Sequence, residues 1–174
     1  MSGASWPRAV FERIHAASSD PWGVGSRPYE RDKYRRTLAL LAGQRFHHAL
    51  ELGCSIGVMT ALLAWQCDHL LAVDVAEAAL AQARRRCAGL KGVTFYRGQL
   101  PDGFPDLPAA SCDLIIISEL LYFLSLSLIP ISCSMAAISS ISRSFLFNFS
   151  SSPNVACYVH DNFLLVVYIL LILL

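Results

Sequence analysis

The chain has 174 residues, enough for one ordinary domain with a buried core, and its formal net charge at pH 7 is +1. A charge this close to zero, without a basic stripe of interleaved aromatic residues, argues against a nucleic-acid-binding surface. The charges are also unevenly spread: residues 1–125 carry 13 Lys or Arg and 12 Asp or Glu, whereas residues 126–174 carry only Arg143 and Asp161.

Hydrophobic spacing and turn residues predict alternating helices and strands in the first two thirds of the chain. Helices are expected where apolar residues recur every three or four positions, at 7–18, 30–42, 57–65 and 76–90. Strands are expected in short apolar segments at 47–52, 69–75, 92–98 and 112–120. The Pro- and Gly-punctuated stretches 18–30 and 103–111 are expected to be loops. This order predicts an α/β fold with a Rossmann-like, doubly wound and mostly parallel sheet.

The turn after the first strand, GCSIG at residues 53–57, is the first place to look for a ligand, because ligands of such sheets bind beyond the carboxyl ends of the strands. The dinucleotide fingerprint G-x-G-x-x-G fails here, since Ser55 and Val58 occupy two of its glycine positions, and the P-loop pattern is absent. The nucleophile elbow G-x-S-x-G fits literally, with Ser55 as its serine. No Ser-His-Asp order follows, so a hydrolase stays the weaker alternative.

A third pattern, E/D-x-G-x-G-x-G, is the first motif of class I S-adenosylmethionine-dependent methyltransferases. Glu51, Gly53 and Gly57 match it, and Ser55 replaces the middle glycine. Asp74 ends the second predicted strand, 21 residues after Gly53, where an acidic residue can accept hydrogen bonds from both hydroxyls of a ribose. Two structural alternatives stay open: a tight turn without a ligand, and a helix N-cap at Asp74.

Three segments together resemble the nodulation protein S family of methyltransferases: DPWGVGSRPYERDKYRRTLALL, ALELGCSIGVMTALLA and DLIIISELLYFL. The resemblance covers about residues 11–124. It implies S-adenosylmethionine as the cofactor and transfer of its methyl group to a small-molecule acceptor. The family suggests an amine or hydroxyl on a saccharide-like molecule as the methylated group, and N-methylation of an amine is the expectation.

The resemblance also implies roles for particular residues. The expected cofactor-binding residues are Glu51, Gly53, Cys54, Ser55, Gly57, Asp74, Val75, Gln99 and Leu100. Among them, Glu51 would bind the methionine ammonium, directly or through water, and Gln99 would accept from the adenine amine. Glu119 is the candidate base for a protonated amine acceptor, with a solvent-facing strand end as its alternative. Candidates for the acceptor site or a lid are Trp22, Tyr29 and Tyr122, with simple packing as their alternative.

The cysteines and the start of the chain indicate the redox state and the cellular compartment expected for the protein. The six cysteines form no CxxC pair and no Cys/His cluster with zinc spacing, so we expect reduced, mostly buried thiols and no metal site. The first 20 residues lack the apolar segment of a signal peptide, which predicts a cytoplasmic protein. The expected partner is a small-molecule acceptor rather than nucleic acid.

The sequence divides into an N-terminal helical lid (1–45), a cofactor-binding core (46–124) and an atypical tail (125–174). The tail is rich in Ser and ends in 12 apolar residues, fewer than the ~20 needed to span a bilayer. Residues 144–150 alternate and could form a strand. We expect a sheet that is incomplete after its fourth strand and a tail from a shifted reading frame, intron read-through or truncation. The alternatives are a membrane-associating tail and a catalytically inactive cofactor-binding remnant.

Overall fold

The computed structural model describes residues 6–100, 102–108 and 111–118, and the backbone of 148–149, 155–160 and 163–168. Its helices are α1 (Arg8–Ala17), α2 (Pro28–Leu40), α3 (Val58–Leu63) and α4 (Glu77–Arg86). Its strands are β1 (Phe46–Leu52), β2 (Cys67–Asp74), β3 (Val93–Arg97), β4 (Leu114–Ser118), β5 (Asn148–Phe149), β6 (Val155–His160) and β7 (Phe163–Tyr168). Every predicted helix and strand before residue 119 is confirmed in type and order.

Helix α2 illustrates where the predicted boundaries are wrong. It begins at Pro28, two residues before the predicted start, because proline fits the first helical turn without losing a needed N–H. It also ends at Leu40 rather than at residue 42. The last three residues of the predicted loop 18–30 therefore already belong to a helix.

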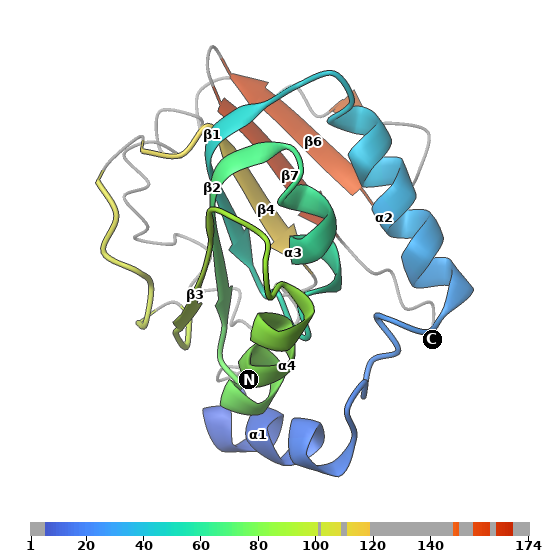
Figure 1. Cartoon of the computed structure of the whole chain (residues 1–174), viewed down its shortest axis with the longest axis vertical. Helices are drawn as coiled ribbons and strands as arrows, with labels where there is room; N and C mark the ends of the chain where they lie inside the picture. The colour runs from blue at the N-terminus through green and yellow to red at the C-terminus, as the bar shows by residue number, and fades with distance from the viewer. Residues whose placement is uncertain are drawn as a thin grey trace, which may run out of the picture.

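The strands form one sheet in the order β3-β2-β1-β4-β7-β6-β5 (Figure 1). Strands β1, β2, β3 and β4 pair in parallel, and β7 extends the parallel set beside β4. Strands β5 and β6 are antiparallel additions. The chain runs outward from β1 to β3 and then returns to place β4 on the other side of β1, so the strand order reverses between β1 and β4. The Rossmann-like, mostly parallel fold is confirmed, and this reversal point is where such sheets bind ligands.

The sheet does not end at its fourth strand, and that expectation is wrong. Residues 163–168 pair with β4 from Leu114↔Leu164 to Ser118↔Tyr168, so β4 lies inside the sheet. The physical reason is that a strand as apolar as β4 is stable with neighbours on both edges, and the apolar end of the chain supplies one. Part of the alternating stretch 144–150 is β5. Among the described residues, no helix is long and apolar enough to cross a membrane.

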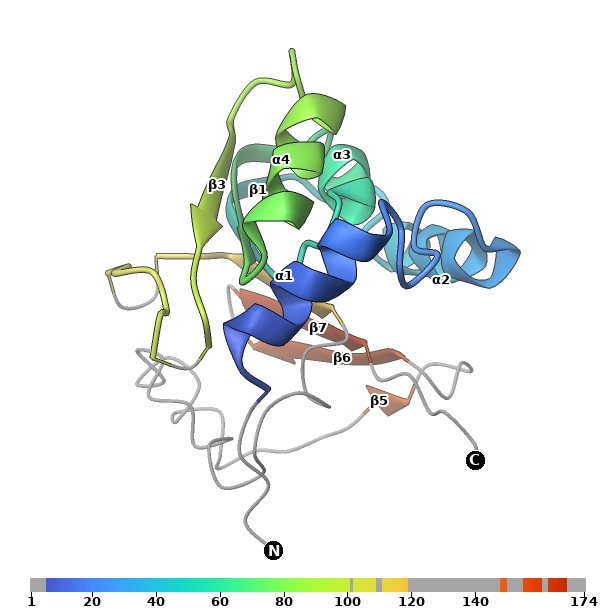
Figure 2. The same ribbon diagram turned by 90° about the horizontal axis from the view of Figure 1, so that it is seen from below.

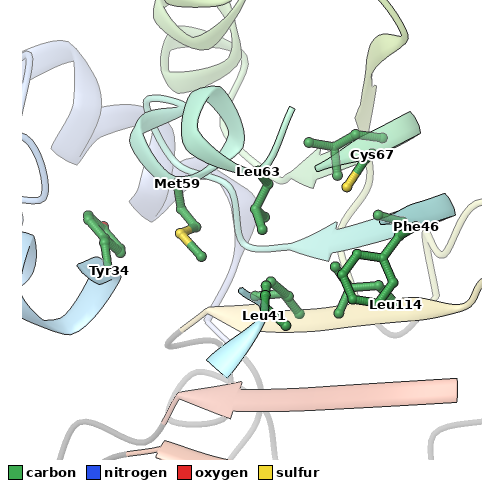
Figure 3. Packing of buried hydrophobic residues seen from close by; sticks show 10 residues of the cluster. Tyr34, Leu41, Phe46, Met59, Leu63, Cys67 and Leu114 are labelled. Atoms are coloured by element: carbon green, nitrogen blue, oxygen red, sulfur yellow. The ribbon is translucent and has the colours of Figure 1, made fainter. Parts of the chain in front are cut away.

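One face of the sheet packs against helices. Figure 2 shows the labelled helices on the same side of the sheet. Tyr34 of α2 and Met59 and Leu63 of α3 belong to one buried cluster with residues of β1, β2 and β4, including Leu114 (Figure 3). Leu80 of α4 packs on Ala72 of β2 and Cys54. Full burial of one such large apolar side chain contributes roughly 1.5–3 kcal/mol to stability. Because several of them are buried on this face, it forms the main hydrophobic core.

The opposite face differs from what a doubly wound sheet predicts. Its buried strand residues are Leu50, Leu52, Val73, Ile115 and Ile117. They are covered by Leu100, Phe104, Leu107 and Cys112, from the segment that joins β3 to β4. In the described part of the chain, an irregular segment thus covers this face, as the predicted loop at 103–111 implies. The proline residues at 105 and 108 are poor helix formers and account for the difference.

The four cysteines that the structure describes are free: Cys54, Cys67, Cys87 and Cys112. The first three are buried and the fourth is half-buried, so they behave as small apolar side chains. For these residues the expectation of buried thiols is confirmed.

Candidate functional site

The candidate site lies at the carboxyl edge of the sheet, where β1 and β4 diverge. The turn from β1 into α3, the end of β2 and the end of β4 all meet this edge. Parallel pairing brings Leu52 next to Val73 and Ile117, so residues that follow these three strands converge. Among the residues expected at the site, Glu51, Gly53 and Asp74 are brought together in this way.

The β1–α3 turn holds a backbone conformation that L-residues rarely adopt. The φ angles are +81° at Gly53, +48° at Ser55 and +75° at Gly57. The amides of Gly53 and Cys54 both donate to the carbonyl of Val73, at 2.8 and 3.0 Å. A glycine adopts positive φ without strain, whereas a serine such as Ser55 is strained there. We infer that the turn keeps this conformation for a reason other than stability.

Gly57 has a second reason to be glycine. A Cβ atom built there would lie 2.8 Å from the Cα of Ala83 in α4, too close for any side chain. The glycine of the motif at position 57 therefore serves the packing of the turn against α4.

Asp74 binds the turn directly. Its two carboxylate oxygens accept hydrogen bonds from the amides of Ser55 (2.8 Å) and Ala76 (2.9 Å). The N-cap of α4 is Ala76, so Asp74 is not that helix cap, although it does hold the chain that leads into the helix. The amide of Val75 also interacts with this carboxylate, and because a carboxylate offers about four acceptor positions, some acceptor capacity remains for a ligand. Burial raises the pKa of Asp74, and the backbone amides oppose that shift.

Glu51 is a buried carboxyl at the end of β1, with only 1% of its surface exposed. The hydroxyl of Thr60 donates to its Oε2 at 2.6 Å. Burial raises the pKa of Glu51 from 4.5 to about 7, with the Thr60 hydrogen bond opposing and the Asp74 carboxylate adding to the shift. A cation bound beside it would ionise it, because an adjacent positive charge stabilises the carboxylate.

Three buried oxygens at this edge have no hydrogen-bond partner among the described residues: Oε1 of Glu51, Oγ of Ser55 and Oγ of Ser118. Leaving such an atom unpaired costs about 1–3 kcal/mol. They come from the ends of β1 and β4 and from the turn between β1 and α3. This arrangement suits a polar ligand that enters at the reversal point of the sheet.

Helix α1, which belongs to the N-terminal segment 1–45 expected to form a lid, reaches this edge of the sheet. Glu12 accepts hydrogen bonds from the amides of Glu77 (2.9 Å) and Ala78 (3.4 Å), at the start of α4. His15 is buried, and burial lowers its pKa while the nearby Asp74 carboxylate opposes that shift. The local sequence of α1 shows only weak helical spacing. Contacts to residues about 60 positions away leave no signal in it.

The remaining cofactor candidates lie in different surroundings. Cys54 and Val75 belong to the turn and to the junction after β2, and Cys54 is 4% exposed. Gln99 is exposed, and its side-chain amide donates to the carbonyl of Trp6 at 3.5 Å, which leaves its side-chain oxygen as an acceptor. Leu100 packs against the second face of the sheet. It therefore contributes to the core as well as to the segment that leaves β3.

The acceptor and lid candidates are only partly described. Trp22 is half-buried in the loop before α2. That loop lies against the β1–α3 turn, since a Cβ on Gly25 would be within 3.7 Å of Ile56 and Val58. Tyr29, 45% exposed, stands at the start of α2, with the ammonium of Lys33 6.0 Å from its ring centroid. Glu119 and Tyr122 lie outside the described residues.

A family model described as Nodulation protein S (NodS) matches residues 8–162. The chain belongs to this family. The match extends beyond the resemblance at 11–124 and includes β5 and β6. The relatives include Nodulation protein S of Rhizobium tropici, 32% identical over 109 residues, which are 62% of this chain and 44% of that protein. The Sinorhizobium fredii protein is 31% identical over 109 residues, 62% of this chain and 49% of that protein. The chain thus spans about half the length of these relatives.

Solved structures agree on the fold. One is N-methyltransferase NodS from Bradyrhizobium japonicum WM9 in complex with S-adenosyl-l-homocysteine. It has a TM-score of 0.62 and 26% identity, and the match covers 80% of this chain and 67% of that chain. A DhpI–S-adenosylhomocysteine complex has a TM-score of 0.56 and 21% identity, and it covers 93% of this chain and 78% of that chain. The second likeness concerns the fold alone.

Proposed function

We propose that this protein is an S-adenosylmethionine-dependent methyltransferase that acts on a small-molecule acceptor. The observation that carries the proposal is the β1–α3 turn of a NodS-family chain. Its residues Gly53 and Ser55 have positive φ, and it is tied to Asp74 beside the unpartnered oxygens of Glu51 and Ser118. Membership of the family supplies the reaction class, and the geometry supplies groups suited to the cofactor.

The residues present fit S-adenosylmethionine, which supplies a methyl group on a positively charged sulfur. Oε1 of Glu51, buried and unpartnered, suits the methionine ammonium. The free acceptor positions of Asp74 suit the two ribose hydroxyls. The side-chain oxygen of Gln99 suits the adenine amine. Gly53 allows the ligand to approach the backbone closely, and Cys54, Val75 and Leu100 complete the wall.

The chain's own residues mainly have to align the acceptor with the methyl group and exclude water. In the transfer, the acceptor's lone pair forms a bond to the methyl carbon while the carbon–sulfur bond breaks and sulfur keeps its electrons. An amine acceptor must also release a proton. We propose Glu119, the residue after β4, as the base that takes it. Trp22, Tyr29 and Tyr122 are proposed to close the acceptor side of the site.

The proposed acceptor is an amine on a saccharide-like molecule. The N-methyltransferase name of the Bradyrhizobium japonicum structure supports an amine. The saccharide part rests on the family resemblance. Because the chain spans about half the length of the curated relatives it matches, acceptor class and turnover both require direct measurement.

Calorimetric titration with S-adenosylmethionine and S-adenosylhomocysteine tests the cofactor. Methyl transfer to glucosamine and its short oligomers then tests the acceptor, with N-acetylglucosamine as a matched control whose nitrogen is blocked. We expect binding of both cofactor forms and methylation of the free amine only. Binding without turnover on any acceptor would favour an inactive cofactor-binding remnant. Absence of binding would contradict the methyltransferase proposal.

The hydrolase alternative has less support. A serine nucleophile needs a base within hydrogen-bonding distance, and Oγ of Ser55 has no partner among the described residues. Because a Ser55→Ala variant keeps the backbone amide that donates to Asp74, a loss of cofactor affinity in this variant would indicate that Oγ of Ser55 contacts the ligand.

A further inference from the structure

We propose that His15 is a ligand-positioning residue of this site: its Nδ1 atom hydrogen-bonds a ribose hydroxyl that Asp74 also holds. The inference rests on the proposed function, and it adds a residue of α1 that the family resemblance did not mark. Three arguments support it: the position of α1, the surroundings of His15, and the hydrogen-bonding chemistry of His15 and Asp74.

Glu12 fixes the place of α1. The N-cap residue of α4, Ala76, makes no side-chain hydrogen bond to the first amides of the helix. Glu12 instead accepts hydrogen bonds from two of these amides, at Glu77 and Ala78. A carboxylate is favourable there because the start of a helix carries partial positive charge. Since α4 begins three residues after Asp74, this contact holds α1 at the carboxyl end of β2.

The start of α1 is held against the same edge of the sheet. The carbonyl of Trp6 accepts from Gln99, which follows β3. Phe11 packs with Ile56 of the β1–α3 turn and with Ala76 and Ala79. Figures 1 and 2 both place α1 beside the start of α4. The helix thus passes over the residues that follow β1, β2 and β3.

His15 lies on the buried side of this helix. Only 7% of its surface is exposed, and its Nδ1 atom is buried without a hydrogen-bond partner among the described residues. The charged groups close to it are Asp74 at the end of β2, Glu12 on its own helix and Asp20 in the following loop. A buried nitrogen left unpaired costs free energy, whereas a ligand hydroxyl would satisfy it.

His15 and Asp74 are chemically suited to share a diol. Burial lowers the pKa of His15 below 6.5, against the three carboxylates, so the imidazole is neutral at neutral pH. A neutral imidazole has one donor and one acceptor nitrogen, and a carboxylate only accepts. A ribose hydroxyl can donate to Asp74 and accept from Nδ1–H at the same time. Each group then uses a hydrogen-bonding position that the protein leaves open.

Two variants separate hydrogen bonding from packing. His15→Asn keeps a polar atom near the position of Nδ1, whereas His15→Leu fills the space without one. Calorimetry with S-adenosylhomocysteine should show about tenfold weaker binding for His15→Leu and less than about threefold for His15→Asn. The control is His69→Gln, an exposed histidine at the amino end of β2, which should bind as the wild type does.

Analogues of S-adenosylhomocysteine that lack the 2′ or the 3′ hydroxyl decide whether the contact is to the ribose. The His15→Leu loss should vanish for the analogue that lacks the contacted hydroxyl. In wild-type protein labelled with 15N-histidine, the Nδ1 resonance of His15 should shift with the full ligand and not with that analogue. This second measurement needs no folded variant.

The outcomes separate the two proposals. If the wild type binds but His15→Leu binds equally well, or loses the same factor for all three ligands, the His15 proposal is wrong and the cofactor proposal stands. An Nδ1 resonance that shifts equally with the full ligand and with both analogues would also overturn it. A wild type that binds none of the three ligands would overturn both proposals.

Discussion

At the scale of single residues, the site contains buried carboxyl groups whose hydrogen bonds within the protein do not fully compensate for their burial. Among the described residues, Glu51 has one hydrogen-bond partner for its two oxygens, and Asp74 accepts hydrogen bonds from the backbone amides of Ser55 and Ala76. Such groups destabilise the empty protein and favour a ligand that satisfies them. Two predictions follow from their protonation and their hydrogen bonds.

Glu51 should make stability depend on pH. The folded carboxyl keeps its proton up to about pH 7 and the unfolded one releases it near pH 4.5, so its contribution is present below pH 4.5 and lost as pH rises to 7. Between pH 5 and 8 the free energy of unfolding of the wild type should fall by about 2–3 kcal/mol relative to that of Glu51→Gln. Urea unfolding at both pH values measures this. Glu77→Gln, at an exposed site, is the control, and a pH-independent difference for Glu51→Gln would contradict the prediction.

Asp74→Ala should lower both ligand affinity and stability. It removes acceptors for the amides of Ser55 and Ala76, so unfolding should require about 1–3 kcal/mol less. Affinity for S-adenosylhomocysteine should fall at least about tenfold. Asp68→Ala is a matched control, since Asp68 pairs with Arg45 at the other end of the same strand. A folded Asp74→Ala protein with unchanged affinity would leave Asp74 only an anchor of the turn.

At the scale of elements, the first helix and the loop after it cover the carboxyl edge of the sheet. Helix α1 caps α4 through Glu12, and the loop before α2 lies on Ile56 and Val58. Described residues of the segment 1–45 thus contact the start of α4 and the β1–α3 turn, and the role of this segment as a lid stays a prediction. Its contacts come from α1 as well as from the loop that carries Trp22. Whether this lid opens stays a prediction.

Glu12→Gln should loosen α1. The neutral amide keeps an acceptor oxygen but loses the charge that favours the start of α4, so unfolding should require about 1 kcal/mol less. Hydrogen exchange should become faster in α1 and in the first turn of α4. Glu77→Gln makes the same change in the partner helix, where the carboxylate pairs with Arg84 in an exposed position. Equal effects of the two changes would show that Glu12 does not act as a cap.

At the scale of the whole molecule, stability depends on strands that come late in the chain. Strand β4 lies at the centre of the sheet because β1 and β7 pair with its two edges. Strand β6 in turn covers the outer edge of β7. The origin of residues 125–174 in a shifted reading frame, read-through or truncation stays a prediction, which the reading frame of the gene tests.

Removing residues 155–174 should expose the edge of β4. That edge belongs to an apolar strand with unpaired backbone groups, which favours association between chains. The shortened protein should show a smaller soluble fraction and lower resistance to urea than residues 1–174, measured side by side. A monodisperse shortened protein of equal stability would mean that β4 does not need β7.

Much of the fold follows from local patterns. The apolar run at 114–117 indicates a buried strand, and the helices up to 86 follow from apolar spacing and turn residues. The motif around Gly53 and the acidic end of β2 place the site, because their positions depend on spacing along one βαβ unit. These features are determined within short stretches of chain, so one sequence is enough to find them.

Tertiary structure alone decided the contacts between distant parts. Glu12 caps a helix that begins 65 residues later, His15 lies beside Asp74, and residues 163–168 complete the edge of β4. Gly57 is glycine because α4 packs 2.8 Å from where its Cβ would be. None of these pairings leaves a periodic or positional signal, since each depends on how helices and strands pack in space. The sequence by itself determined the elements and the motif, and packing decided which side chains surround the site.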